Sequence, residues 1–382
     1  VPDTVQAVLA ARIDALHENE KAALQAASVI GRRFRSAELD ALLPGADAFL
    51  EALQSRGFVT LRGNSRSGSG AEYEIAHALI RDVAYASLPR ARRAQLHATA
   101  ARWTEAAAVS PSESAARLAY HYYEAVRPDV TDLAWASDDA TLAELQGHAR
   151  RWLRTAAAQA IGRFEIDAAL ALLSDALRIV DEPWARVGVL ISAARAHALR
   201  FDGRGFRDAM EEAIKLTEID ADAADLHSTL AFQTLVRAGM WNPAPGADVL
   251  EAWIEAALSG DGVRDRTRAR ALIARGYSDE DKAIETITEA VEIAERIDDV
   301  SLRSYSYDVR VSRELAFGSA ATAYAWQEKR LALMDDITDP DHRADILMSA
   351  IAPALSMGRI DEARQHAHLL DEVTQPLSEH HR

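Results

Sequence analysis

Apolar residues recur at three- and four-residue steps along most of the chain, which is the spacing of one face of a helix. In residues 1–16 these positions are Val5, Val8, Leu9, Ile13 and Leu16. Further helices are predicted at residues 18–30, 36–43 and 47–56. Each of the three is followed by a glycine or a Pro-Gly pair, the usual stop signal of a helix.

A different pattern interrupts the helices once. Residues 58–61 alternate between apolar and polar like a strand, and residues 73–75 return as its partner. Between them, residues 62–70 are rich in glycine and serine and predict the tip of a hairpin. Helices followed by a two-stranded hairpin indicate a winged-helix domain over residues 1–88.

Beyond this domain, residues 89–382 predict only helices, separated by short breaks. The helices pair, and the pairs recur about every 34 to 42 residues, as in tetratricopeptide-like repeats. In the clearest copy, Gly358 stands at the turn between the two helices and Ala363 follows it. Small residues are needed there because the helices of a pair approach closely. The predicted fold class is all-α with a minor β hairpin: a winged helix followed by a tetratricopeptide-like α-solenoid.

Two segments break the helical array. Residues 127–139 predict a polar loop with Trp135 as an anchor. The sharper break is residues 240–246, MWNPAPG, whose two prolines disfavour a helix. Trp241 in this break either lines a pocket or covers a helix end. We predict a ligand or partner surface that includes Trp241, Arg237 and Tyr277.

The composition narrows the class of protein. The chain is 49% hydrophobic but only 6% aromatic, and alanine dominates, which favours close-packed helices. It has no cysteine, which excludes disulfides and thiolate sites and favours a cytoplasmic location. No apolar run is long enough to cross a membrane, and no leader pattern is present. The start at Val1 without methionine suggests a fragment of a longer protein.

Charge is distributed unevenly. Residues 1–100 hold 12 Lys and Arg against 11 Asp and Glu, whereas the rest holds 31 against 48. The acidic array should repel nucleic acid. The helix at 47–56 would be the DNA reader of a winged helix, but it carries Asp47 and Glu51 against one terminal Arg56. DNA binding is therefore the weaker interpretation of this domain.

The sequence predicts neither catalysis nor a metal site. It contains no P-loop motif and no G-x-S-x-G elbow. His121 and Glu124 lie one helical turn apart, but no third ligand joins them. A run of alternate arginines, Arg264, Arg266, Arg268 and Arg270, spreads around a helix and predicts a solvated, salt-bridged face.

One histidine stands at a strand-to-helix junction, where free backbone N–H groups favour anions. Residues 77–82, HALIRD, begin with His77 and resemble the histidine motif that closes the winged helix of STAND signalling ATPases. The motif's best-known form has methionine and aspartate where this chain has Ala76 and Ala78. The resemblance implies that His77 approaches the β-phosphate of bound ADP and stabilises an inactive state.

Residues 81–101 also resemble the segment that follows the ATPase module in bacterial STAND regulators linked to adenylyl-cyclase-like or LuxR-type output domains. The resemblance implies a missing upstream P-loop module that binds ATP or ADP, and an array that receives a protein or small-molecule input. Two alternatives stay open: a nucleotide-independent scaffold for protein interactions and a DNA-binding winged helix. Association of the chain into a homo-oligomer stays open as well.

Overall fold

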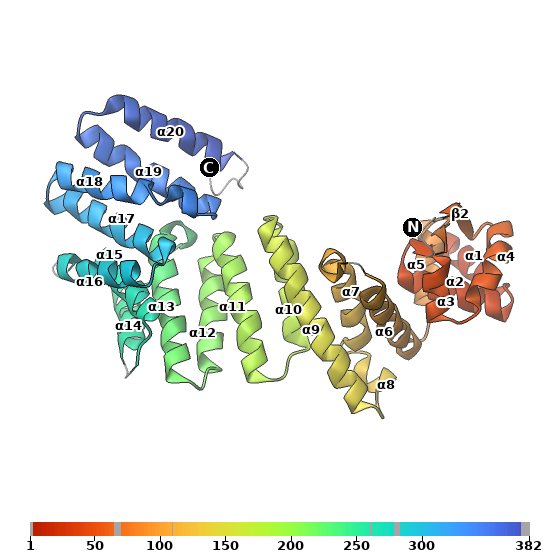
Figure 1. Cartoon of the computed structure of the whole chain (residues 1–382). Coiled ribbons are helices and arrows are strands. Elements are labelled where there is room, and N and C mark those ends of the chain that lie inside the picture. Colours follow the sequence, from red (N-terminus) through yellow and green to blue (C-terminus); the bar gives the residue numbers. More distant parts are fainter. Residues whose placement is uncertain (1–2, 65–69, 109, 260–261, 279–282, 376–382) are drawn as a thin grey trace. The chain divides into compact units, whose positions relative to one another are not determined.

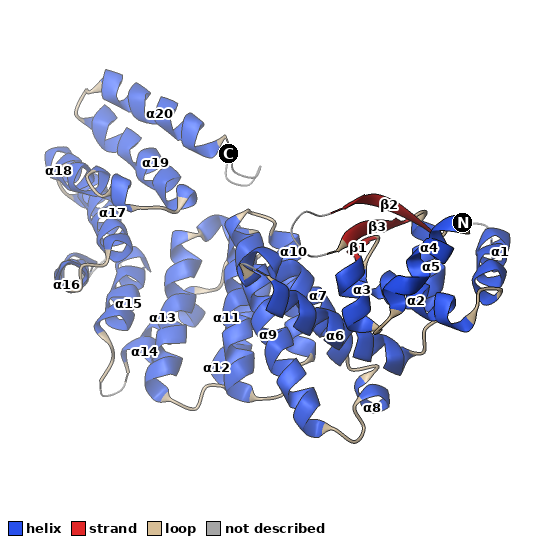
Figure 2. Ribbon diagram, turned by 45° about the vertical axis from the view of Figure 1, so that its right-hand side comes forward, coloured by secondary structure: helices blue, strands red, loops and turns tan. Residues whose placement is uncertain are grey.

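The computed structural model describes residues 3–64, 70–108, 110–259, 262–278 and 283–375 (Figure 1). It is nearly all helical, with one small sheet, and confirms the predicted fold class (Figure 2). The chain forms two compact units, residues 1–162 with 167–181, and residues 163–166 with 182–382. The domain boundary predicted at residue 88 separates the winged helix from the helical repeats, and it stays a prediction. No helix in the described ranges is both long and apolar enough to span a bilayer.

The first unit opens with the winged helix. Its elements are α1 (Asp3–Asp14), α2 (Glu18–Ile30), β1 (Arg33–Arg35), α3 (Ser36–Leu42), η1 (Ala46–Phe49), α4 (Leu50–Ser55), β2 (Val59–Asn64), β3 (Ala71–Ile75) and α5 (Ala78–Ala86). The helix predicted at 47–56 is thus a 3₁₀ turn followed by a short α-helix. Residues 65–69 of the predicted hairpin tip lie outside the described residues.

The sheet has three strands rather than the predicted two, in the order β1-β3-β2. Both outer strands pair antiparallel with β3, with Arg33 opposite Glu74 and Val59 opposite Ile75. Strand β1 was missed because its three residues, RFR, contain only one apolar side chain. Phe34 is nevertheless buried, and its ring stacks on Tyr73 at 6.0 Å. That contact fixes the strand over the domain core.

The remaining helices of the first unit are α6 (Arg90–Ala107), η2 (Pro111–Ser114), α7 (Ala115–Val126), α8 (Thr131–Ala134), α9 (Asp139–Gly162) and α10 (Ile166–Arg178). Alanines on the inner faces of α6, α7 and α9 are buried, so these helices pack closely, as the composition predicted. The segment predicted as a loop at 127–139 contains the short helix α8. Trp135, which follows α8, donates from Nε1 to the Ala125 carbonyl at 2.9 Å, which confirms its anchoring role.

The second unit consists of antiparallel helical hairpins. Its elements are α11 (Pro183–Leu199), α12 (Gly203–Lys215), α13 (Asp220–Val236), η3 (Ala238–Met240), α14 (Ala247–Leu258), α15 (Asp265–Ser278), α16 (Ala283–Arg296), α17 (Val300–Phe317), α18 (Ala320–Leu331), η4 (Met334–Asp336), α19 (Pro340–Ser356) and α20 (Ile360–Thr374). The break predicted at 240–246 is confirmed, because α14 begins only at Ala247.

The hairpin turns use different residues in the left-handed region. Gly358 has φ +72° at the α19–α20 turn, as its position predicted. At other turns the positive φ belongs to Phe201 (59°) and Asp298 (51°), which side chains other than glycine rarely adopt. Glycine spacing therefore located only some of the turns between helices.

Candidate functional site

His77 caps the N-terminus of α5, directly after β3. Its side chain is exposed, and its Nδ1 accepts a hydrogen bond from the Leu79 N–H at 3.3 Å. An Nδ1 that accepts leaves the proton of a neutral ring on Nε2. Nε2–H is thus a donor available to a group outside the winged helix.

A histidine that merely packs in the core would be buried, and His77 is not. Its contact with a nucleotide phosphate stays a prediction. Arg81, one turn further along α5, donates from Nε to the Ser28 carbonyl at 3.3 Å and so ties α5 to α2.

A cavity of about 370 Å³ lies in the second unit. Its walls come from the ends of α11 and α13, from η3, and from α17, α19 and α20. The residues that line it are Phe201, Val236, Arg237, Ala238, Gly239, Tyr305, Asp341, Ala344, Asp345, Met348, Leu370 and Thr374. We call it the Arg237 pocket. Most of these side chains are apolar, and the polar ones are Arg237, Tyr305, Asp341, Asp345 and Thr374.

Arg237 lines this pocket and links the end of α13 to α19, a helix far away in the sequence. Its side chain is 11% exposed, pairs with Asp341 and lies 3.8 Å from Asp339. Asp339 also caps α19 by accepting the Asp341 N–H at 3.0 Å. The C-terminal end of α13 is therefore fixed to the first turn of α19.

Behind the pocket, the guanidinium of Arg330 on α18 is completely buried. It donates to Asp308, Asp345 and Ser349, and its Nε donates to Ser304 at 3.2 Å. Burial alone would lower the pKa of Arg330, but Asp308 and Asp345 raise it above its usual value. Burial and the nearby Asp308 raise the pKa of Asp345. One buried cation thus holds two crowded carboxylates.

Two ring side chains, Tyr305 and His342, pack next to this buried network. The ring of Tyr305 stacks on His342 at 4.1 Å, and His342 Nε2 lies 2.9 Å from Ser304 Oγ. Burial, followed by the charges of Arg330 and Arg237, lowers the pKa of His342 to about 3. His342 is therefore neutral at physiological pH. Within the described residues, the Tyr305 hydroxyl makes no hydrogen bond, so it can serve a ligand.

The three residues predicted to form a ligand or partner surface lie in different places. Arg237 lines the pocket. Tyr277 joins the network behind it, because its hydroxyl donates to Asp308 at 2.5 Å. Trp241 is not among the lining residues and covers Gly203 instead, where an added Cβ would lie 2.7 Å from the indole. A binding role for any of the three stays a prediction.

Sequence reasoning missed Arg330, Asp345, Tyr305 and His342. The one available signal was spacing: Arg330 lies seven residues after Ala323 and three after Gln327, on a face of α18 where all three are buried. An arginine on an otherwise inward face indicates a buried ion pair only when its acidic partners are known.

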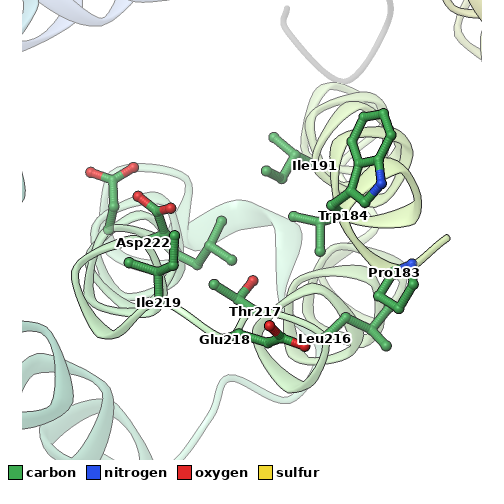
Figure 3. A pocket seen from close by; sticks show the side chains of 11 residues that line it. Pro183, Trp184, Ile191, Leu216, Thr217, Glu218, Ile219 and Asp222 are labelled. Carbon is green, nitrogen blue, oxygen red and sulfur yellow. The ribbon is translucent and has the colours of Figure 1, made fainter.

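A second cavity, of about 460 Å³, lies between α11 and the start of α13 (Figure 3). Trp184 and Ile191 stand on one wall, and Ile219 and Asp222 face them across the opening. We call it the Trp184 groove. It is mainly apolar, and its polar side chains are Thr217, Glu218, Asp222 and Asp225.

His121 and Glu124, which the sequence places one helical turn apart on α7, have different partners. His121 Nδ1 lies 2.9 Å from Nδ1 of His97, both rings are buried, and His97 Nε2 lies 2.9 Å from the Tyr85 hydroxyl. Glu124 pairs instead with Arg127 at 3.2 Å. Among the residues that the structure describes, no group of three or more His, Cys, Asp or Glu could hold a metal ion.

The sequence matches no protein-family model and no curated protein. Among solved structures, the chain is similar to a Signal Transduction ATPase with Numerous Domains (STAND) protein with a tetratricopeptide repeat sensor from Pyrococcus horikoshii. That structure has 13% identity and a TM-score of 0.41, with 95% of this chain and 58% of the other covered. A second similar structure is BtubC from P. vanneervenii, with 16% identity, a TM-score of 0.29, and 72% and 90% covered. The chain thus spans 58% of the length of the first structure.

Proposed function

We propose that this chain is the regulatory and sensor part of a cytoplasmic, bacterial STAND-type signalling ATPase or transcriptional regulator. In this proposal the winged helix clamps a P-loop module that lies upstream in the longer protein. The helical array receives the input, and His77 contacts the phosphate of ADP. The output domain would be of the adenylyl-cyclase-like or LuxR type.

The observation that carries the proposal is the exposed His77 at the start of the HALIRD stretch, which resembles the histidine motif of STAND ATPases. Its ring is held by the cap to Leu79, which presets its orientation before any module docks. The helix N-terminus beside it also favours a phosphate. In a DNA-binding winged helix, η1 and α4 would lie against the DNA, where Asp47 and Glu51 would be repelled by the phosphates. These two residues therefore favour the clamp over the DNA interpretation.

The Arg237 pocket supplies a route for a small-molecule input. A ligand with hydrogen-bond donors would bind Asp345 and Tyr305 and place its apolar part against Phe201 and Leu370. Because the pocket walls come from both α13 and α19, such a ligand would change how these helices lie within the second unit. A ligand can shift a conformational equilibrium only by binding one state better, so in this proposal the input binds one arrangement of α13 and α19 more tightly than another.

The test uses the longer protein encoded by the gene. Its coding sequence upstream of Val1 should contain a P-loop and a Mg²⁺-binding aspartate. In the purified protein, His77→Ala should release ADP roughly ten- to a hundredfold faster, the loss of about one charge-assisted hydrogen bond. Absence of the P-loop, or unchanged ADP retention, would overturn the proposal.

The Trp184 groove favours a second candidate function, a scaffold that binds proteins without regard to nucleotide. Its exposed apolar walls fit a protein segment better than a small polar molecule. Partner binding that is the same with ATP, with ADP and with neither would support this alternative and count against the nucleotide-gated one.

A further inference from the structure

Three large apolar side chains that line the Trp184 groove are exposed to solvent. Trp184 is 71% exposed, Ile219 61% and Ile191 41%. Trp184, Val187 and Ile191 recur at helical spacing along one face of α11, while Val189 and Leu190 on the same helix are buried. The groove is therefore a continuous apolar face and not a single misplaced side chain.

The charged residues of the groove are all acidic. Glu218, Asp222 and Asp225 line it, and no Lys or Arg does. Asp222 pairs with Arg264 at 2.7 Å, and Asp225 accepts from Arg270 at 3.1 Å. Among the residues that the structure describes, Glu218 has no such counterion. A carboxylate beside an apolar surface without a cation of its own favours a cationic group on whatever covers that surface.

We infer that the Trp184 groove binds a segment of a partner protein that places a bulky apolar side chain between Trp184 and Ile219 and a lysine or arginine against Glu218. The volume of about 460 Å³ is in the range of pockets that hold one or two large side chains. The apolar contact supplies most of the affinity, and the ion pair selects the sign of the partner's charge.

This inference rests on the proposed function only in that the array is a binding module. It needs neither a nucleotide nor the Arg237 pocket. The two fail separately, because the peptide titration described next uses this chain alone, whereas the proposed function is tested by ADP retention in the longer protein.

The probe is a fluorescein-labelled synthetic peptide in which leucine and phenylalanine alternate with lysine. One control peptide carries glutamate in place of lysine, and another carries serine in place of the apolar residues. Fluorescence anisotropy should show saturable binding of the lysine peptide, at least about tenfold weaker binding of both controls, and weaker binding at higher salt.

Variants locate the binding. Trp184→Ser and Ile219→Ser should each weaken it by about tenfold or more, the loss of one buried apolar side chain. Glu218→Lys should weaken the lysine peptide and strengthen the glutamate peptide. Phe317→Ser is the matched control, since Phe317 is also exposed (68%) but lies on α17, and it should change nothing. Because all four positions are exposed, the variants should unfold at the same temperature as the parent.

Three outcomes would overturn the inference. They are binding that Trp184→Ser leaves unchanged, equal binding of the lysine and glutamate peptides, and no saturable binding of the lysine peptide at millimolar concentration. Self-association of the chain that Trp184→Ser abolishes, seen by light scattering, would assign the groove to a second copy and overturn it as well.

Discussion

Arg237 at the end of α13 forms an ion pair with Asp341 in the first turn of α19. The two residues are far apart in the sequence, and several helical hairpins lie between them. Because repeat units otherwise contact mainly their neighbours, this pair is a long-range link within the second unit. It also forms one edge of the Arg237 pocket.

Replacement of this arginine should loosen the link. Arg237→Met keeps an unbranched apolar stem but removes the charged guanidinium, so Asp339 and Asp341 lose their cation. Since both carboxylates are partly exposed, we expect a loss of only about 1–2 kcal/mol in unfolding free energy. Hydrogen exchange of the first turn of α19 should rise. Arg264→Met, which removes an exposed pair with Asp222, is the control and should cost less than about 1 kcal/mol.

Arg330 should matter more than any other arginine in the second unit. Arg330→Met leaves Asp308 and Asp345 without their cation and removes the hydrogen bond from Arg330 Nε to Ser304, which should cost about 3–5 kcal/mol. Urea unfolding measures the loss. A second substitution, Asp345→Asn, should recover part of it, because it removes one stranded charge. A cost below about 1 kcal/mol would show that the network is not formed in solution.

The arginines show what the sequence could and could not predict. The run at 264–270 was expected to form surface salt bridges, and the structure confirms pairs for all four arginines. That prediction needed only the period of a helix. The burial of Arg330 depends on Asp308 and Asp345, which two other helices contribute, and no local pattern connects them. The same reason kept Asp341 from being assigned to Arg237.

The winged helix, too, was predicted only in part from the sequence. Helix and strand periods predicted its helices and two of its strands, while β1 contains one apolar residue and carried no signal. His77 was located from the strand-to-helix junction and the resemblance, and its exposure could not be inferred from either. The Trp184 groove was not predicted, because the exposure of α11 depends on how its neighbours pack.

Packing at the break before α14 can be tested with one methyl group. A Cβ at Gly203 would lie 2.6 Å from the Met240 carbonyl oxygen and 2.7 Å from the Trp241 ring. Gly203→Ala should therefore destabilise the second unit by about 1–3 kcal/mol, despite the better helix propensity of alanine. Gly147→Ala on α9 is the matched control, because nothing lies within 4 Å of its added Cβ. There we expect a gain of up to about 1 kcal/mol. A stabilised Gly203→Ala variant would mean that Trp241 does not cover this site.

The buried pair His97–His121 should make the first unit sensitive to acid. Burial lowers the pKa of both rings, with further contributions from His121 and Arg93 on His97 and from Arg117 on His121, whose pKa falls to about 3. The unfolded chain binds these protons near pH 6.5, whereas the folded chain does not. Stability should therefore be complete above about pH 6.5 and fall as pH decreases toward 3, by up to about 1.4 kcal/mol per pH unit for each histidine.

Urea unfolding of the first unit, monitored at several pH values between 7 and 4, measures how its stability depends on pH. The double variant His97→Phe with His121→Phe should flatten it, whatever its stability at pH 7. His368→Gln is the control, since His368 is exposed on α20 in the other unit. If the slope persists in the double variant, other groups cause the acid sensitivity.

The structural and nucleotide roles proposed for His77 can be separated by two substitutions. His77→Asn keeps an acceptor for the Leu79 N–H, so the stability of the winged helix should be unchanged, while His77→Ala loses the cap and should cost about 0.5–1 kcal/mol. Neither variant retains the Nε2 donor. In the longer protein both should release ADP faster than the parent and to a similar extent, measured by exchange of a fluorescent ADP analogue. If only His77→Ala releases ADP faster, the effect comes from the lost cap, and His77 does not contact the phosphate.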